Sequence, residues 1–202
     1  MASQDPQIHS PATRITHWFA AASFVLLFAT GAAIFDRRPR LRLGLQTFTL
    51  PQVPSWLTMT AEPRLIHYVF AAIFILCGVA YLTWGLRSGH FAALTFKRTD
   101  WPKLLPMQLY YLRLRKDPSA YGQYNPLQKL AYTVVLFAIA PLLVLSGVAL
   151  FESRIFEPLS AIFIGGARLW HIVLTVVLCL FVIGHLGMVL STGFMKNMRK
   201  MV

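Results

Sequence analysis

The sequence predicts an all-α membrane protein, built as a bundle of four transmembrane helices in a single domain of residues 1–202. Two observations lead to this prediction. The chain is 56% hydrophobic and only 13% charged. It also contains four apolar runs, each long enough to cross a bilayer, which takes about 20 residues of helix. We expect the spans at 16–35, 64–86, 127–151 and 168–190.

The first span starts near Thr16 and ends before the charged stretch Asp36-Arg-Arg-Pro. Since no small-residue cleavage pattern accompanies it, we expect it to remain as a membrane anchor. Residues 36–63 are rich in Arg, Pro and Thr, so they are expected to form a surface loop with a short hairpin. Pro63 then suits the first turn of the second helix.

The third span starts after Pro126 and contains Pro141, which we expect to kink it, because proline removes a backbone donor. Between the second and third spans, residues 87–126 mix aromatic, leucine and cationic side chains. This mixture is typical of a helix lying in the membrane interface, which we expect at about 94–120. Cys77 and Cys179 lie within apolar runs and are expected to be small core residues.

The net charge of +12 comes from basic residues between the spans rather than within them. Such placement marks the cytoplasmic face of a membrane protein and argues against nucleic acid as a partner. Four spans put both termini on one side. That side carries about twelve of the 19 Lys and Arg, so we expect both termini in the cytoplasm.

Four of the six histidines lie inside the predicted spans, while His9 and His90 lie outside them and are expected to be solvated. A polar side chain within a membrane is costly and usually faces the bundle interior with a partner. One such histidine would suit an interhelical hydrogen bond. Four in one small bundle favour axial ligands of haem, for which a bundle interior is a common site. No C-x-x-C-H segment occurs, so any haem is of the non-covalent b type.

The depths of these histidines along their helices pair them. His171 and His185 are fourteen residues apart on one helix, which places them on one face, separated by about 21 Å. Matching by depth then gives His17 with His185 near the cytoplasm and His67 with His171 near the opposite face. Each pair is expected to clamp the iron of one haem b from two helices.

An arginine precedes three of these histidines by three residues: Arg14, Arg64 and Arg168. Each arginine lies one helical turn closer to the membrane surface than its histidine. Haem propionates point toward the polar surface, and arginine suits carboxylates, so we expect these residues to bind propionates. The alternative is that they are snorkelling anchors at the ends of the spans.

Three sequence features resemble bacterial di-haem cytochrome b subunits, such as those of formate dehydrogenase (the gamma subunit), thiosulfate reductase and nickel-iron hydrogenase, a group that is also cytochrome b561-like. They are Thr16-His17-Trp18 at the head of the first span, Tyr124-Asn-Pro-Leu-Gln-Lys129 before the third, and the fourteen-residue histidine spacing of the last. The resemblance covers almost the whole chain.

The resemblance implies an electron-transfer subunit of the bacterial inner membrane, docked to a periplasmic redox enzyme of molybdenum type or to a cytochrome c. Electrons would enter at the outer haem, reach the inner haem and reduce a quinone held in the membrane near the cytoplasmic side. The segment before the third span then supplies candidate quinone ligands, Tyr124, Asn125 and Gln128. The alternative for Asn125 is that it caps the third span.

Two other functions stay open. One is a stand-alone cytochrome b561-type superoxide:quinone oxidoreductase, which would need the same two histidine pairs. The other is a haem-free membrane anchor or transporter whose histidines only form hydrogen bonds or bind metal. Hydrolytic and phosphoryl-transfer chemistry is unsupported, because the sequence contains neither a G-x-S-x-G segment nor a P-loop.

Overall fold

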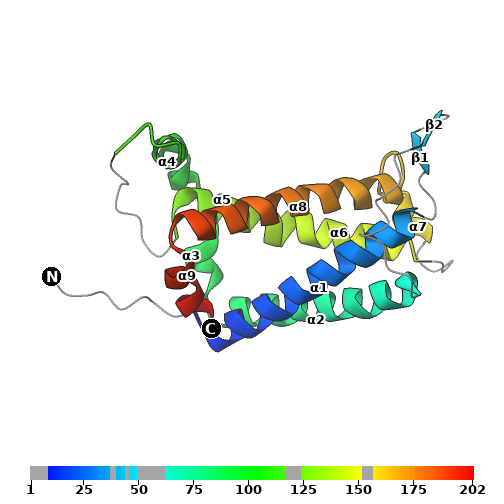
Figure 1. The fold of residues 1–202 in the computed structure, drawn as a ribbon, viewed down its shortest axis with the longest axis horizontal. Coiled ribbons are helices and arrows are strands. Elements are labelled where there is room, and N and C mark those ends of the chain that lie inside the picture. The colour runs from blue at the N-terminus through cyan, green and yellow to red at the C-terminus, as the bar shows by residue number, and fades with distance from the viewer. Residues whose placement is uncertain (1–8, 37–39, 44–45, 50–61, 117–123, 152–156) are drawn as a thin grey trace.

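The computed structural model describes residues 9–36, 40–43, 46–49, 62–116, 124–151 and 157–202. Among them are four helical segments long and apolar enough to span a membrane, as the sequence predicts. They are α1 (Pro11–Asp36), α2 (Pro63–Arg87), the continuous segment formed by α5 (Pro126–Val134), η3 (Val135–Ile139) and α6 (Ala140–Ala149), and α8 (Ala167–Ser191) (Figure 1).

The start of α1 differs from the prediction. The helix begins at Pro11 rather than near Thr16, because Ser10 caps it: the Thr13 amide donates to the Ser10 Oγ at 3.2 Å. Hydropathy does not reveal this extra turn, since its residues are polar or small. The turn carries Arg14 and so extends the helix into the polar interface.

The third span is irregular next to Pro141, where the sequence predicts a kink. The residues just before it, η3, form a turn of π-helix instead of α-helix. Proline lacks the amide that an α-helical carbonyl one turn earlier would need, and a π turn is one way to accommodate this loss.

The four spans form two layers, with α1 packed along α2 and α6 along α8 (Figure 1). One end of the bundle carries the antiparallel strands β1 (Arg40–Leu43) and β2 (Gln46–Thr49) and the short helix α7 (Glu157–Ser160). We call this the hairpin end, and its hairpin agrees with the prediction for the first loop. The opposite end, the α9 end, carries α9 (Phe194–Met201).

The connection between the second and third spans also lies at the α9 end. It contains α3 (Phe91–Leu94), the 3-10 helix η2 (Arg98–Lys103) and α4 (Leu104–Tyr111). The interfacial segment predicted at 94–120 is thus largely helical as far as residue 111, and its last residues, 117–120, lie outside the described part of the chain. Trp101 and Leu105 are exposed, as suits a helix in the membrane interface.

Asp100 fixes this connection to the bundle. It is buried, and its carboxylate lies 3.5 Å from Lys129 Nζ on α5 and 3.7 Å from Lys103 Nζ. Burial alone would raise the pKa of the Asp100 carboxyl, but the Lys97 amide and the two ammonium groups outweigh it and hold the pKa below its usual value. The ion pair therefore positions the start of α5 against η2.

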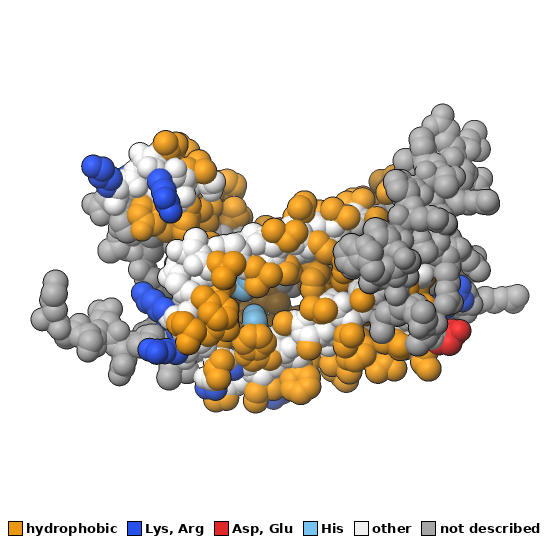
Figure 2. Space-filling model, viewed as in Figure 1, with side chains coloured by type: hydrophobic (Ala, Val, Ile, Leu, Met, Phe, Trp, Pro, Cys, Tyr) orange, Lys and Arg blue, Asp and Glu red, His pale blue; other side chains and the backbone are white. Residues whose placement is uncertain are grey.

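The surface matches a membrane environment. Figure 2 shows hydrophobic side chains along the flank of the bundle and Lys and Arg side chains gathered at the α9 end. At most 17% of the residues in the apolar window of any of the four spans are buried inside the protein, so most of these side chains face outward. The chain is therefore a multi-pass membrane protein.

Candidate functional site

The structure brings the four membrane histidines together in two pairs, one near each end of the bundle. In the α9-end pair, the ring centres of His17 (α1) and His185 (α8) are 6.3 Å apart. In the hairpin-end pair, the ring centres of His67 (α2) and His171 (α8) are 6.4 Å apart. Each pair joins one helix of each layer. These are the pairs that the depths along the helices indicate.

The separations fit two axial ligands of one iron. Two metal–nitrogen bonds of about 2 Å, plus about 1.2 Å from each nitrogen to its ring centre, place two such rings about 6 Å apart. Figure 2 also shows histidine side chains within a hollow between the two layers, near the α9 end.

The number of donors also fits haem. Within the described residues, no three His, Cys, Asp or Glu side chains come together as a metal site would require. A zinc or similar site needs three or four protein ligands. Haem needs only the two axial positions, because the porphyrin supplies the other four nitrogens. Cys77 and Cys179 are free thiols, and both are partly exposed rather than buried in the core as predicted.

Hydroxyl groups fix the orientation of both rings in the hairpin-end pair. Thr30 on α1 is fully buried, and its Oγ1 lies 3.0 Å from Nδ1 of His67. The same hydroxyl donates its hydrogen to the Leu26 carbonyl at 2.7 Å. It can therefore only accept from the imidazole, so Nδ1 carries the proton and Nε2 presents its lone pair.

His171 has the equivalent arrangement on the other layer. Its Nδ1 lies 3.0 Å from Oγ of the fully buried Ser146 on α6, and 3.2 Å from the Leu143 carbonyl. Ser146 donates its own hydrogen to Leu143 at 2.9 Å. A carbonyl can only accept, so Nδ1 of His171 is also protonated and its Nε2 is the free ligand atom.

A glycine follows each of these hydroxyl residues and gives the ring room. A Cβ on Gly31 would lie 3.5 Å from Cε1 of His67, and one on Gly147 would lie 3.1 Å from Cε1 of His171. Both glycines therefore lie at the depth of the hairpin-end pair. Sequence reasoning missed the hydroxyl partners, although both precede a glycine within an otherwise apolar span.

The α9-end pair has a different environment. Nδ1 of His17 is buried and has no hydrogen-bond partner among the described residues. Its ring lies edge-on to Trp18 at 5.3 Å between centres, while His185 stacks on Phe181 at 6.0 Å. Aromatic packing holds these two rings, and among the described residues neither makes a hydroxyl contact like those of the other pair.

The three arginines predicted to bind propionates occupy different surroundings. Arg168 places its guanidinium 5.7 Å from the ring centre of Phe35, at the hairpin end. Arg64, one turn before His67, is exposed at the same end. Arg14 lines a pocket on α1 with Trp18, at the α9 end.

The predicted quinone residues lie together at the start of α5, where they also build the helix cap. The Gln128 amide donates to the Asn125 side chain at 2.9 Å, and the Asn125 amide donates to Oε1 of Gln128 at 3.1 Å. The Asn125 side chain also donates to the Tyr111 hydroxyl at 3.0 Å. The capping alternative for Asn125 is therefore observed. Tyr124 is buried beside them, and burial raises the pKa of its phenol.

The expectation for His90 is wrong: this side chain is half-buried in an aromatic cluster, not solvated. Its Nε2 lies 3.1 Å from the Tyr81 hydroxyl, and its ring lies 4.9 Å from that of Trp84. Gly89, with φ of 70°, turns the chain back after α2 and so returns His90 onto that helix. His9 is also half-buried, beside α9, where its amide donates to the Lys200 carbonyl at 3.0 Å.

Comparisons with known proteins find similarity along almost the whole chain. The family model described as "Prokaryotic cytochrome b561" matches residues 8–202. The chain is 30% identical to a putative protein-methionine-sulfoxide reductase subunit, YedZ1, of Azospira oryzae, over 94% of this chain and 93% of that protein. It is 23% identical to a putative cytochrome, YdhU, of Escherichia coli, over 89% of this chain and 66% of that protein. No solved structure matches the chain.

Proposed function

This chain belongs to the prokaryotic cytochrome b561 family of membrane electron-transfer proteins, and we propose that it is a di-haem subunit linking a periplasmic redox partner to the quinone pool. The observation that carries the proposal is the pair of matched ring separations, 6.3 and 6.4 Å, at the two ends of one bundle. Family membership implies haem b, and the number of haems is our inference from the two pairs.

The four histidines are the proposed axial ligands, two for each haem. When bound, haem b supplies a one-electron couple at each pair, so two pairs on opposite sides of the bundle suit electron transfer across a membrane. Thr30 and Ser146 keep Nε2 of His67 and His171 unprotonated and aimed between the layers. Phe181 and Trp18 hold the rings of the α9-end pair. Arg64 and Arg168 are proposed to neutralise propionates; the same role predicted for Arg14 is not proposed, because its side chain lines a separate pocket between α1 and α9.

We place the α9 end in the cytoplasm, because it carries most of the basic residues. The hairpin end then faces the periplasm of a bacterial inner membrane and offers the surface for a redox partner. The similarity to a putative methionine-sulfoxide reductase subunit favours a reductase as that partner. Since a reductase consumes electrons, we propose flow from quinol to the partner, opposite to the direction that the formate dehydrogenase resemblance implies.

The first test is the haem content of the purified chain, measured by a pyridine haemochrome assay and a reduced-minus-oxidised spectrum. We expect two b-type haems per chain. One haem would contradict the assignment of a pair. A well-folded chain without haem would overturn the proposal and favour the haem-free anchor or transporter.

For the quinone site we propose Tyr124, Asn125 and Gln128, which lie at the cytoplasmic end in this orientation. Because Gln128 also takes part in the cap of α5, the test must distinguish a loss of quinone binding from a loss of this cap. Gln128→Glu keeps an oxygen that accepts from the Asn125 amide and replaces the side-chain N–H donors with a second oxygen of a carboxylate. If those donors bind quinone, Gln128→Glu lowers quinol oxidation by about tenfold, as expected for loss of one hydrogen bond to a substrate.

Gln128→Ala is the matched comparison, because it removes the cap as well and should also lower stability by about 1 kcal/mol. Both variants should keep the haem spectrum of the parent. Normal turnover of Gln128→Glu at every quinol concentration would exclude Gln128 from the quinone site.

The second candidate is a stand-alone superoxide:quinone oxidoreductase, which the cytochrome b561 family match favours. It would need no partner protein. Reduction of quinone by superoxide with the isolated, haem-loaded chain would support it. Electron transfer only after a periplasmic protein is added would support the partnered subunit.

A further inference from the structure

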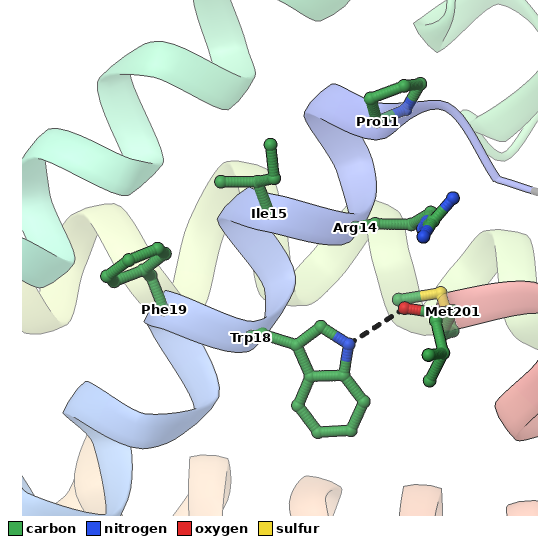
Figure 3. Close-up of a pocket in the computed structure, with 7 residues that line it drawn as sticks. Pro11, Arg14, Ile15, Trp18, Phe19 and Met201 are labelled. Atoms are coloured by element: carbon green, nitrogen blue, oxygen red, sulfur yellow. Dashed lines mark hydrogen bonds between the residues drawn. The ribbon is translucent and has the colours of Figure 1, made fainter.

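A pocket of about 420 Å³ lies on the outer side of α1 at the α9 end, separate from the histidine pairs. It is lined by Pro11, Arg14, Ile15, Trp18, Phe19, Met201 and Val202. Figure 3 shows Arg14 and Trp18 extending from α1 toward Met201, with the Trp18 indole donating to the Met201 carbonyl. That hydrogen bond is 2.8 Å long and ties α9 to α1.

The pocket combines one cation with apolar walls. Neither the span Pro11–Phe35 nor α9 contains an acidic residue, and α9 adds Lys196, Arg199 and Lys200 to the same end. The local charge is therefore positive, and the ligand that it favours carries negative charge. Ile15 and Phe19 are 59% and 58% exposed, so the walls open toward the acyl region of the bilayer.

The depth of the cation suits a headgroup. Arg14 lies about 5 Å along α1 from its first residue, at 1.5 Å per residue, so its guanidinium reaches the interface. Ile15 and Phe19 follow it toward the membrane centre. Trp18, with its N–H on the polar side, has the position of an interfacial aromatic. This order of residues, from the interface toward the membrane centre, matches a lipid. Its anionic headgroup would lie at Arg14 and its hydrocarbon chain along Ile15 and Phe19.

Quinone fits the pocket less well. Both quinone reduction and quinol oxidation require a group that exchanges protons, whereas a guanidinium does not release its proton in proteins. The Trp18 N–H is already engaged with Met201. The chemistry of the pocket is therefore that of anion binding, without proton transfer.

We propose that this pocket binds one anionic phospholipid, with its phosphate on Arg14 and an acyl chain along Ile15 and Phe19. The lipid fills the space between α1 and α9 and holds α9 in place. Because Trp18 also contacts His17 at 5.3 Å between ring centres, the lipid would stabilise the helix surface behind one haem ligand. The proposal does not depend on the electron-transfer function.

The test is lipid retention by the full chain. Wild type is reconstituted in bilayers of dioleoyl phosphatidylglycerol and dioleoyl phosphatidylcholine in equal amounts, extracted into detergent and analysed by native mass spectrometry. We expect one retained phosphatidylglycerol and no comparable retention of phosphatidylcholine. Arg14→Gln should lower the phosphatidylglycerol-bound fraction by about tenfold or more, as expected for loss of a charge-assisted hydrogen bond.

Arg199→Gln is the matched control, because it removes the same charge from the same end at an exposed position that does not line the pocket. It should retain lipid as wild type does. Equal retention of the two lipids, or unchanged retention by Arg14→Gln, would overturn the proposal. If Arg14→Gln fails to fold, Ile15→Trp provides the same test, since it fills the pocket from an exposed position. Undiminished lipid retention by that variant would likewise overturn the site.

Discussion

The two histidine pairs have nearly equal ring separations but different surroundings. In the hairpin-end pair, each Nδ1 bonds a buried hydroxyl at 3.0 Å, from Thr30 or Ser146. In the α9-end pair, Nδ1 of His17 is buried without a partner among the described residues. The geometry needed for an axial ligand is thus achieved in one place by hydrogen bonds and in the other by aromatic packing.

This difference bears on function, because the second hydrogen bond of a ligating histidine sets its orientation and its basicity. A more basic imidazole stabilises the oxidised iron and lowers the reduction potential. We therefore expect the haem at His67 and His171 to be held more tightly and to have the lower potential of the two. The membrane protein would then have two unequal redox centres built from the same residue type.

The largest expected effect comes from removing a ligand from either pair. His67→Ala should abolish the haem at the hairpin end and leave the other, and His185→Ala should do the reverse. Haem per chain should fall from two to one in each variant, and redox titration should show a single remaining component. Because we expect unequal potentials, the surviving component should differ between the two variants.

The pairing would be wrong if either substitution removed both haems from a folded protein, or if neither removed any. Helical content measured by circular dichroism is the control for folding in both variants.

A smaller effect should follow from removing one hydroxyl contact. Thr30→Val keeps the shape of the side chain but removes the hydroxyl partner of His67 Nδ1–H, so that the backbone carbonyl of Leu27 is the acceptor that remains beside the ring. Loss of such a contact typically costs about 10- to 100-fold in metal affinity. We expect faster haem loss and a raised potential at the hairpin end, measured by transfer to apomyoglobin and by redox titration.

Thr175→Val is the matched control. Thr175 also donates to the backbone of its own helix, at 2.7 Å to the His171 carbonyl, but within the described part of the chain its hydroxyl bonds no imidazole. It should therefore leave both haems unchanged. If Thr30→Val and Thr175→Val behave alike, the hydroxyl contact does not distinguish the two pairs.

The sequence predicts the spans and the pairs because both follow from periodicity along a helix. Hydropathy locates the four spans, and a rise of about 1.5 Å per residue turns spacing into depth. The hydroxyl partners depend on how each helix is rotated toward its neighbour, which spacing along one helix does not reveal. Thr30 lies thirteen residues after His17, roughly 140° around α1, so it faces α2 rather than the partner of His17.

The error at His90 has a different origin. Distance from a predicted span suggested solvent, but Gly89 reverses the chain and packs His90 against Tyr81 and Trp84. A glycine directly after a span is visible in the sequence, yet the direction of the following segment depends on tertiary packing. Local turns at span ends are therefore the weakest part of such a prediction.

The smallest expected effect is a difference between the two rings of the hairpin-end pair when the glycine beside each ring is replaced by alanine. Gly147→Ala would place a Cβ 3.1 Å from His171 Cε1, which is closer than ordinary contact, whereas Gly31→Ala would place one 3.5 Å from His67 Cε1. Only the first substitution should force its ring to shift, by a few tenths of an ångström. The expected result is a change in the low-spin electron paramagnetic resonance signal of one haem in Gly147→Ala, with retained stoichiometry. Gly31→Ala should keep the parental signal. Identical spectra for both variants would mean that the layers adjust freely around the rings, and that the hydroxyl contacts alone distinguish the hairpin-end pair from the α9-end pair.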